Sequence, residues 1–174
     1  MIRVLGIDPG LAHTGFGVIE IYNSKIHYLD HGEFTTSSEL TVGNRLEKIY
    51  TELISLIRQY KPTESGIESL YFTRNSKSAI PVAQARGVIL LALAQKGVYA
   101  REYTPQEIKQ AIVGSGRAEK SQVQEFVKIL LGLTDIPCPD HAGDALAAAI
   151  CHFHNGYGKP YSIKKDSTES YYDK

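Results

Sequence analysis

Three acidic residues lie where separate elements of secondary structure are expected to end or begin. Asp8 and Glu68 each close a short apolar run, and Asp144 lies near the start of an alanine-rich segment, one helical turn after His141. Carboxylates brought close together repel one another unless a cation neutralises them. Oxygen ligands favour hard ions such as Mg²⁺ or Mn²⁺, and two such ions about 4 Å apart can hydrolyse a phosphodiester without a serine or cysteine nucleophile. The acids therefore predict a divalent-metal site suited to phosphodiester hydrolysis.

Each acid also has a purely structural explanation when it is taken alone. Asp8 precedes Pro9-Gly10 and fits a turn. Asp144 would stabilise a helix N-terminus through the helix dipole. The metal-site interpretation therefore depends on whether the fold brings the acids together.

A zinc site is a weaker alternative. Cys138 and Cys151 could combine with three histidines, which are His141, His152 and His154. The two cysteines lack the usual Cys-x-x-Cys spacing. Two small buried side chains explain them better, and two cysteines make no disulfide framework.

The elements that must position these residues follow from the hydrophobic periodicity. We expect strands at residues 2–8, 14–21, 26–34, 64–68 and 98–103, and helices at residues 42–60, 79–96, 105–113, 118–131 and 141–154. Three strands in close succession predict antiparallel pairing, and the later alternation of strands and helices predicts an α/β fold with a mixed sheet flanked by helices.

Between and beyond these elements, residues 69–78 read as a polar, basic and aromatic loop. The helix at 79–96 tolerates Pro81 only in its first turn. Its apolar residues cover more than one face, which fits either a dimer interface or a central core helix. We expect residues 1–155 to form one domain and residues 156–174 to be a flexible tail.

The charge is unevenly distributed although the formal net charge of the 174 residues is zero. Residues 1–57 carry a net charge of −3, residues 58–128 a net charge of +5, and residues 129–174 a net charge of −2. The middle of the chain can therefore offer phosphates a basic face. No apolar run approaches the roughly 20 residues of a membrane helix, and none resembles a signal peptide, so we expect a cytoplasmic protein.

Several segments form an ordered set of motifs: residues 7–10 (IDPG) with 14–15 (TG), 66–68 (GIE), 84–87 (QARG), 106–124 (QEIKQAIVGSGRAEKSQVQ) and 141–147 (HAGDALA). In this order and spacing, from residue 2 to about residue 154, they resemble the RuvC family of Holliday junction resolvases. The resemblance implies an RNase H-like fold, a homodimer, and paired symmetric nicks across a four-way DNA junction in recombination and repair. It also implies RuvA–RuvB as the branch-migration partner.

The same resemblance implies the catalytic metal ligands, which are Asp8, Glu68, His141 and Asp144. Two Mg²⁺ ions are expected. Many members have aspartate where His141 stands, and the imidazole nitrogen suits Mn²⁺ better than Mg²⁺. Asp140 is not taken as the missing acid, because it would point about 100° away from His141 on an ideal helix.

The resemblance further implies a set of DNA-binding residues, which are Tyr71, Phe72, Arg74, Lys77, Lys109, Arg117 and Lys120. Lys120 is expected near the scissile phosphate as a catalytic residue and Lys109 on the DNA backbone. Tyr71 is expected to stack on an unpaired base at the junction centre, with Phe72 left open.

Three other functions are weighed against this one. An actin-like ATPase also begins with an Asp-x-Gly hairpin, but it needs a second lobe for which 174 residues is short. A non-catalytic DNA-binding relative would lack one of the acids, whereas Asp8, Glu68 and Asp144 are all present here. An RNase H-like nuclease acting on RNA–DNA hybrids is disfavoured only by the resemblance of residues 69–78 and 106–124.

Overall fold

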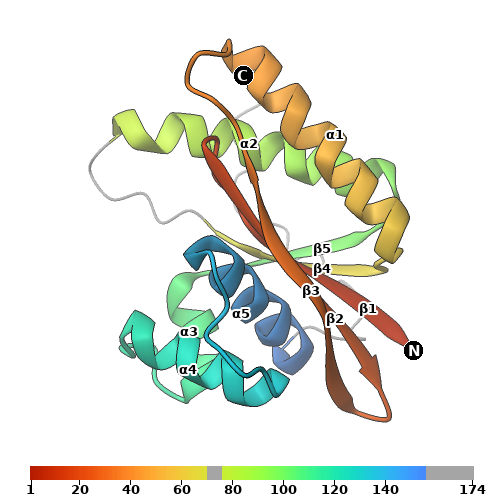
Figure 1. The fold of residues 1–174 in the computed structure, drawn as a ribbon, viewed down its shortest axis with the longest axis vertical. Coiled ribbons are helices and arrows are strands. Elements are labelled where there is room, and N and C mark those ends of the chain that lie inside the picture. Colours follow the sequence, from red (N-terminus) through yellow and green to blue (C-terminus); the bar gives the residue numbers. More distant parts are fainter. Residues whose placement is uncertain (70–75, 156–174) are drawn as a thin grey trace, which may run out of the picture.

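The structure is a computed structural model that describes residues 1–69 and 76–155, with only the backbone described for 76–78. Five strands form one sheet: β1 (Ile2–Asp8), β2 (His13–Tyr22), β3 (Lys25–Thr35), β4 (Glu64–Glu68) and β5 (Tyr99–Tyr103). Their order across the sheet is β3-β2-β1-β4-β5 (Figure 1). The first three strands pair antiparallel, whereas β1, β4 and β5 run parallel. The predicted mixed sheet is therefore confirmed.

Helices cover both faces of this sheet. α1 (Val42–Tyr60) and α2 (Ser76–Gln95) lie on one face, and α3 (Pro105–Val113), α4 (Lys120–Leu131) and α5 (Asp140–Asn155) lie on the other (Figure 1). Alternate residues of β1 serve the two layers: Leu5 and Ile7 pack in the core under α1 and α2, and Val4 packs in the core under α3 to α5. The sheet is thus a rigid central layer on which α5 lies directly.

The approach of α5 to the sheet requires glycine on the strands. A Cβ at Gly6 of β1 would lie 1.9 Å from the carbonyl oxygen of Ala145, and a Cβ at Gly15 of β2 would lie 1.9 Å from the carbonyl oxygen of His141. No larger residue fits at either position without moving the helix. The glycines therefore determine how near the residues of α5 come to the end of β1.

Side-chain caps hold the N-termini of two helices. Thr41 caps the N-terminus of α1 by accepting a hydrogen bond from the N–H of Asn44. Thr104 and Glu107 form a capping box before α3, with Pro105 at its first position. The predicted bounds of α1 and α3 are accordingly confirmed.

Three helices begin at other residues than predicted, and several other bounds differ by one residue. α2 begins at Ser76 rather than at 79, so that Pro81 lies inside the helix, beyond the first turn. Proline there removes one helical hydrogen bond near the start of a helix of 20 residues, and packing outweighs this local penalty. α4 begins at Lys120 rather than at 118. α5 begins at Asp140, which puts Asp144 in its second turn.

In the part of the chain that is described, no helix is long and apolar enough to cross a membrane.

Candidate metal centre and nucleic-acid site

The carboxyl ends of two neighbouring parallel strands carry the first two acids. In the pairing of β1 with β4, Ile7 lies opposite Ile67, so the residues that follow them, Asp8 and Glu68, lie at the same edge of the sheet. α5 crosses this edge and carries His141 and Asp144 on one face. The sheet topology therefore brings the ends of β1 and β4 and the start of α5 together, as predicted.

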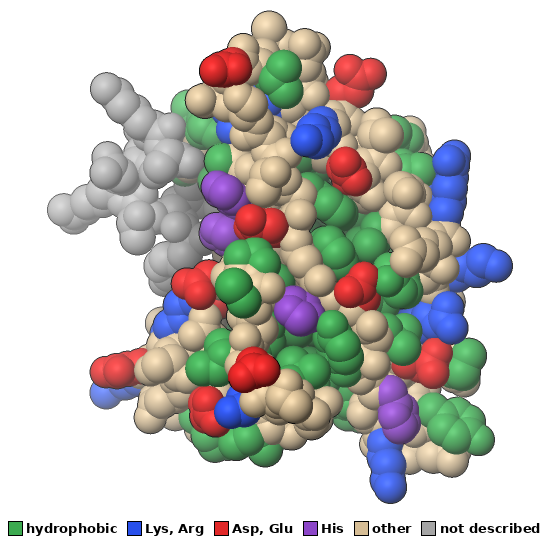
Figure 2. Space-filling view, in the orientation of Figure 1, with side chains coloured by type: hydrophobic (Ala, Val, Ile, Leu, Met, Phe, Trp, Pro, Cys, Tyr) green, Lys and Arg blue, Asp and Glu red, His purple; other side chains and the backbone are tan. Residues whose placement is uncertain are grey.

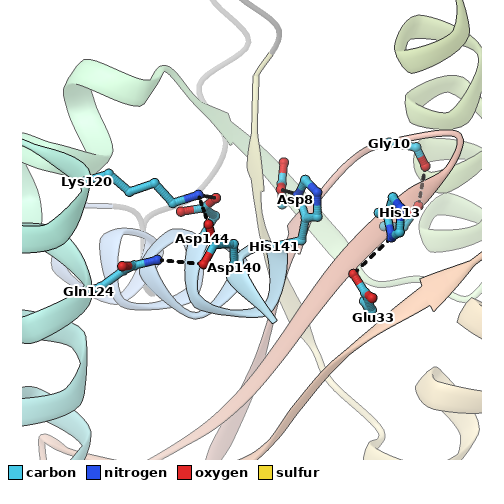
Figure 3. A network of polar contacts seen from close by, with 10 residues as sticks. Asp8, Gly10, His13, Glu33, Lys120, Gln124, Asp140, His141 and Asp144 are labelled. Atoms are coloured by element: carbon cyan, nitrogen blue, oxygen red, sulfur yellow. Dashed lines mark hydrogen bonds and ion pairs between the residues drawn. The ribbon is translucent and has the colours of Figure 1, made fainter. Parts of the chain in front are cut away.

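Three of the predicted ligands form a compact set. One ligand atom from each of Asp8, His141 and Asp144 lies within 4.8 Å of the others. His141 Nδ1 lies 2.7 Å from Asp8 Oδ2, which joins the start of α5 to the end of β1 (Figure 3). Among the described residues this is the only group of three or more acids, histidines or cysteines with such a spacing. The arrangement can hold a divalent cation.

Glu68 lies in the same cleft, although it is not a member of that compact set. A hollow of about 350 Å³ is lined by seven residues, which are Asp8, Pro9, Glu68, Ser69, Pro105, His141 and Asp144. Burial, and then the charges of Asp8 and Asp144, raise the pKa of Glu68 to about 8. Ionising Asp8, Glu68 and Asp144 together is therefore unfavourable unless a bound cation neutralises them.

The pKa of Asp8 is also raised. Burial is the main cause and the charge of Asp144 adds to it, while the hydrogen bond with His141 acts in the opposite direction. Crowded carboxylates with raised pKa values in a cleft are typical of functional sites. The donor set, three carboxylates and one imidazole, fits Mg²⁺ or Mn²⁺.

Lys120 lies at the rim of the cleft. Its Nζ is 2.9 Å from Asp144 Oδ2 and 3.3 Å from Asp140 Oδ2. Burial acts to lower the pKa of Lys120, but the hydrogen bond to Asp144 and further contacts with the acids outweigh it and raise the pKa. Lys120 and Lys109 also line an adjoining hollow of about 200 Å³ together with Glu68 and Asp144. Both lysines are therefore next to the acids.

Arg117 lies elsewhere. It lines a hollow of about 810 Å³ together with Arg101 and residues of α3, and none of the cleft acids takes part in that hollow. On the face shown in Figure 2, basic and acidic side chains are interspersed and do not form one basic patch. Tyr71, Phe72, Arg74 and the side chain of Lys77 lie outside the described residues.

Sequence reasoning missed His13 and Glu33. The ring of His13 stacks on that of His141, with centroids 5.6 Å apart and planes 13° apart. His13 Nδ1 lies 3.3 Å from Glu33 Oε2 on β3 (Figure 3). The stacking of His13 on His141 depends on the close approach of α5 to β2 at Gly15. The local sequence around His13 contains no pattern that predicts this stacking.

The residues of the alternative zinc site do not meet. Cys151 is buried as expected and lies near Asn155, but Cys138 is exposed, so the expectation of two buried cysteines was wrong for Cys138, which precedes α5 in a connecting segment. His152 is fully buried, with Nε2 2.6 Å from Glu64 Oε2 and Nδ1 2.9 Å from the hydroxyl of Tyr103. Within the described ranges neither cysteine belongs to a set of metal-ligand spacing.

Comparison with known proteins identifies the family. The family model described as crossover junction endodeoxyribonuclease RuvC matches residues 4–152. This chain belongs to the RuvC family. A RuvC of Treponema denticola is 53% identical over 153 residues, covering 88% of this chain and 86% of that protein. A RuvC of Caldicellulosiruptor saccharolyticus is 52% identical over 152 residues, covering 87% and 92%.

Solved structures agree with the RuvC assignment. The structure of T. thermophilus RuvC in complex with a Holliday junction substrate matches with a TM-score of 0.84 and 33% identity, covering 88% of this chain and 94% of that one. The yeast mitochondrial Holliday junction resolvase Ydc2 matches with a TM-score of 0.63 at 14% identity, which bears on the fold alone. The predicted RNase H-like class is confirmed, and membership of the RuvC family decides against an actin-like ATPase.

Proposed function

We propose that this chain is a metal-dependent endonuclease that resolves four-way DNA junctions by paired symmetric nicks, acting in recombination and repair in the cytoplasm. The observation that carries the proposal is the convergence of Asp8, His141 and Asp144 within 4.8 Å in a chain of the RuvC family. The structure of a relative in complex with a Holliday junction substrate supports the same substrate for this chain.

The metal ligands in this proposal are Asp8, Glu68, His141 and Asp144. Two Mg²⁺ ions are proposed, with Mn²⁺ as the alternative that the nitrogen of His141 favours. When bound, such ions supply an activated water and stabilise the charge on the leaving oxygen. The raised pKa of Glu68 supports this assignment, because a carboxylate that is costly to ionise alone is ionised readily beside a cation.

The remaining residues act on the DNA. Lys120, at the rim of the cleft, carries a compact positive charge that can contact the scissile phosphate, and Lys109 can contact the backbone beside it. Arg117, Arg74 and Lys77 are proposed as further phosphate contacts. Tyr71 is proposed to stack on an unpaired base, with Phe72 as its alternative.

We further propose a homodimer that uses α2. Five residues at helical spacing form an exposed stripe along this helix, which are Ile80, Gln84, Gly87, Leu91 and Ala94. The side chains of Ile80 and Leu91 are 60% and 54% exposed. An exposed stripe that carries Ile80 and Leu91 suits a two-fold interface, and a two-fold dimer presents two sites to a two-fold substrate. Residues 1–155 are proposed as the nuclease domain and RuvA–RuvB as the partner. The tail expected at residues 156–174 lies outside the described residues.

The test is strand mapping on an end-labelled four-way junction, with a linear duplex and an RNA–DNA hybrid of the same sequence as controls. Each substrate is incubated with Mg²⁺, with Mn²⁺ and with chelator. The proposal predicts symmetric nicks on the junction alone and only with a metal. Equal cutting of the hybrid, or no cutting of the junction in either metal, would contradict it.

A further inference from the structure

Asp140 occupies an unusual position beside the cleft. It is the first residue of α5, and its side chain is 73% exposed. Its two carboxylate oxygens contact the same face of α4: Oδ2 lies 3.3 Å from Lys120 Nζ, and Oδ1 lies 3.3 Å from Gln124 Nε2 (Figure 3). Lys120 and Gln124 are one helical turn apart and therefore face the same way. Gln124 thus orients the carboxylate that meets Lys120.

Lys120 is shared by two acids with different surroundings. Asp144 belongs to the compact ligand set with Asp8 and His141, whereas Asp140 does not. A divalent cation held by Asp144 would compete for its carboxylate and repel the ammonium of Lys120. The side chain of Lys120 is 50% exposed, so without a second contact it could turn into solvent.

We propose that Asp140 is a positioning residue for Lys120. It retains the ammonium beside the cleft when the carboxylate of Asp144 binds a divalent cation. Lys120 then remains within reach of a phosphate and no longer competes for Asp144. This inference rests on the proposed nuclease function. It concerns an acid that lies outside the ligand set and that acts only through the lysine.

The expected effect is modest because the ion pair is exposed. Asp140→Asn keeps the shape of the side chain and removes its charge. We expect it to slow junction cutting about two- to five-fold, the range that one exposed ion pair supports. Raising the salt concentration should diminish the difference, because exposed charges are screened.

A double-mutant cycle tests whether Asp140 acts through Lys120. Single-turnover cutting rates are measured at saturating metal and saturating protein for the wild type, Asp140→Asn, Lys120→Ala and the double variant. The cycle should show the slowing by Asp140→Asn only where Lys120 is present. The same factor in both backgrounds, or no slowing in the wild-type background, overturns the proposal. Asp135→Asn is the control for removal of an exposed acid, since Asp135 is contacted by Thr134 and lies just before α5.

Metal binding without DNA gives a second, independent measurement. With Asp140 neutralised, Lys120 should pair with Asp144 alone and compete more strongly with Mn²⁺. Titration calorimetry should therefore show a larger loss of Mn²⁺ affinity on Asp140→Asn when Lys120 is present than in the Lys120→Ala background. An equal loss in both backgrounds would mean that the charge of Asp140 acts on the bound cation directly and not through Lys120, and the inference fails. If the wild type does not cut junctions, the proposed function fails instead, and the Mn²⁺ titration still decides on the role of Asp140.

Discussion

At the scale of single residues, Glu68 links the chemistry of the cleft to the stability of the protein. Its pKa is raised from an ordinary 4.5 to about 8 by burial and by the neighbouring carboxylates. The folded state therefore holds this proton more tightly than the unfolded chain does. The stabilisation that protonated Glu68 gives the folded state is fully present below about pH 4.5 and is lost as the pH rises toward 8.

This raised pKa predicts how Glu68→Gln behaves. In chelator, the melting temperature of the wild type should fall between pH 5 and pH 8, and that of Glu68→Gln should fall less, because glutamine carries no proton to lose. Thermal unfolding at several pH values measures this. If the melting temperatures of the two proteins fall equally between pH 5 and pH 8, the assigned environment of Glu68 is wrong. Added Mg²⁺ should recover the wild type at pH 8 by neutralising the cleft.

The sequence was sufficient to predict the acids of the cleft but not their surroundings. Asp8, Glu68 and Asp144 were found because strand ends and helix starts are visible in the periodicity of the chain. The stacking of His13 on His141 and the contact of Lys120 with Asp140 join residues far apart in the chain. Such contacts are set by the distances between packed elements, which no local pattern encodes.

At the scale of elements, the approach of β2 to α5 determines where His141 lies. Gly15→Ala should force these elements apart, because the new Cβ would lie 1.9 Å from a backbone oxygen that cannot turn away. We expect a loss of about 1–3 kcal/mol in the free energy of unfolding, together with slower junction cutting. Gly43→Ala is the matched control, since a Cβ there meets nothing within 4 Å.

Denaturant unfolding of both variants provides the test. Gly43 lies on α1, so the control should be unchanged or slightly more stable, by up to about 1 kcal/mol. If Gly15→Ala unfolds like the wild type, the close packing of α5 on β2 is not a constraint, and the account of how His141 is positioned fails.

Capping signals alone do not decide how well an element's bounds can be predicted. Caps at Thr41 and Thr104 begin α1 and α3 where these helices were predicted, whereas α4 begins two residues after its predicted start although Glu119 and Gln122 form a capping box there. The start of α2 was not predictable, because its first turn is polar and a proline follows at position 81. Packing of the helix on the sheet and on α1, which is a tertiary effect, outweighs these local signals.

At the scale of the whole molecule, the exposed stripe on α2 predicts a dimer. Leu91→Glu should separate the protomers, because a carboxylate would be buried in the interface without a partner. Ile129→Glu is the control, as Ile129 is 64% exposed on α4, on the other side of the sheet. Light scattering coupled to size exclusion measures the mass. A monomeric wild type, or a dimeric Leu91→Glu variant, would contradict the proposal.

The proposed dimer would also determine how the substrate is cut. Two sites are needed for two symmetric nicks, so Leu91→Glu should convert paired nicks into single, uncoordinated ones. The fold of each protomer should remain, because Leu91 is 54% exposed in the described structure. The far-UV circular dichroism spectrum of the variant checks this.

We propose that the acids at the ends of β1 and β4 and on α5 form one metal-dependent nuclease site. The most direct measurement is single-turnover cutting of a four-way junction by Asp8→Asn, beside junction affinity measured in the same buffer. Asp135→Asn, an exposed acid outside the cleft, is the control. We expect Asp8→Asn to bind the junction with an affinity like that of the wild type and not to cut it. Substantial cutting by Asp8→Asn in Mg²⁺ or Mn²⁺ would contradict it.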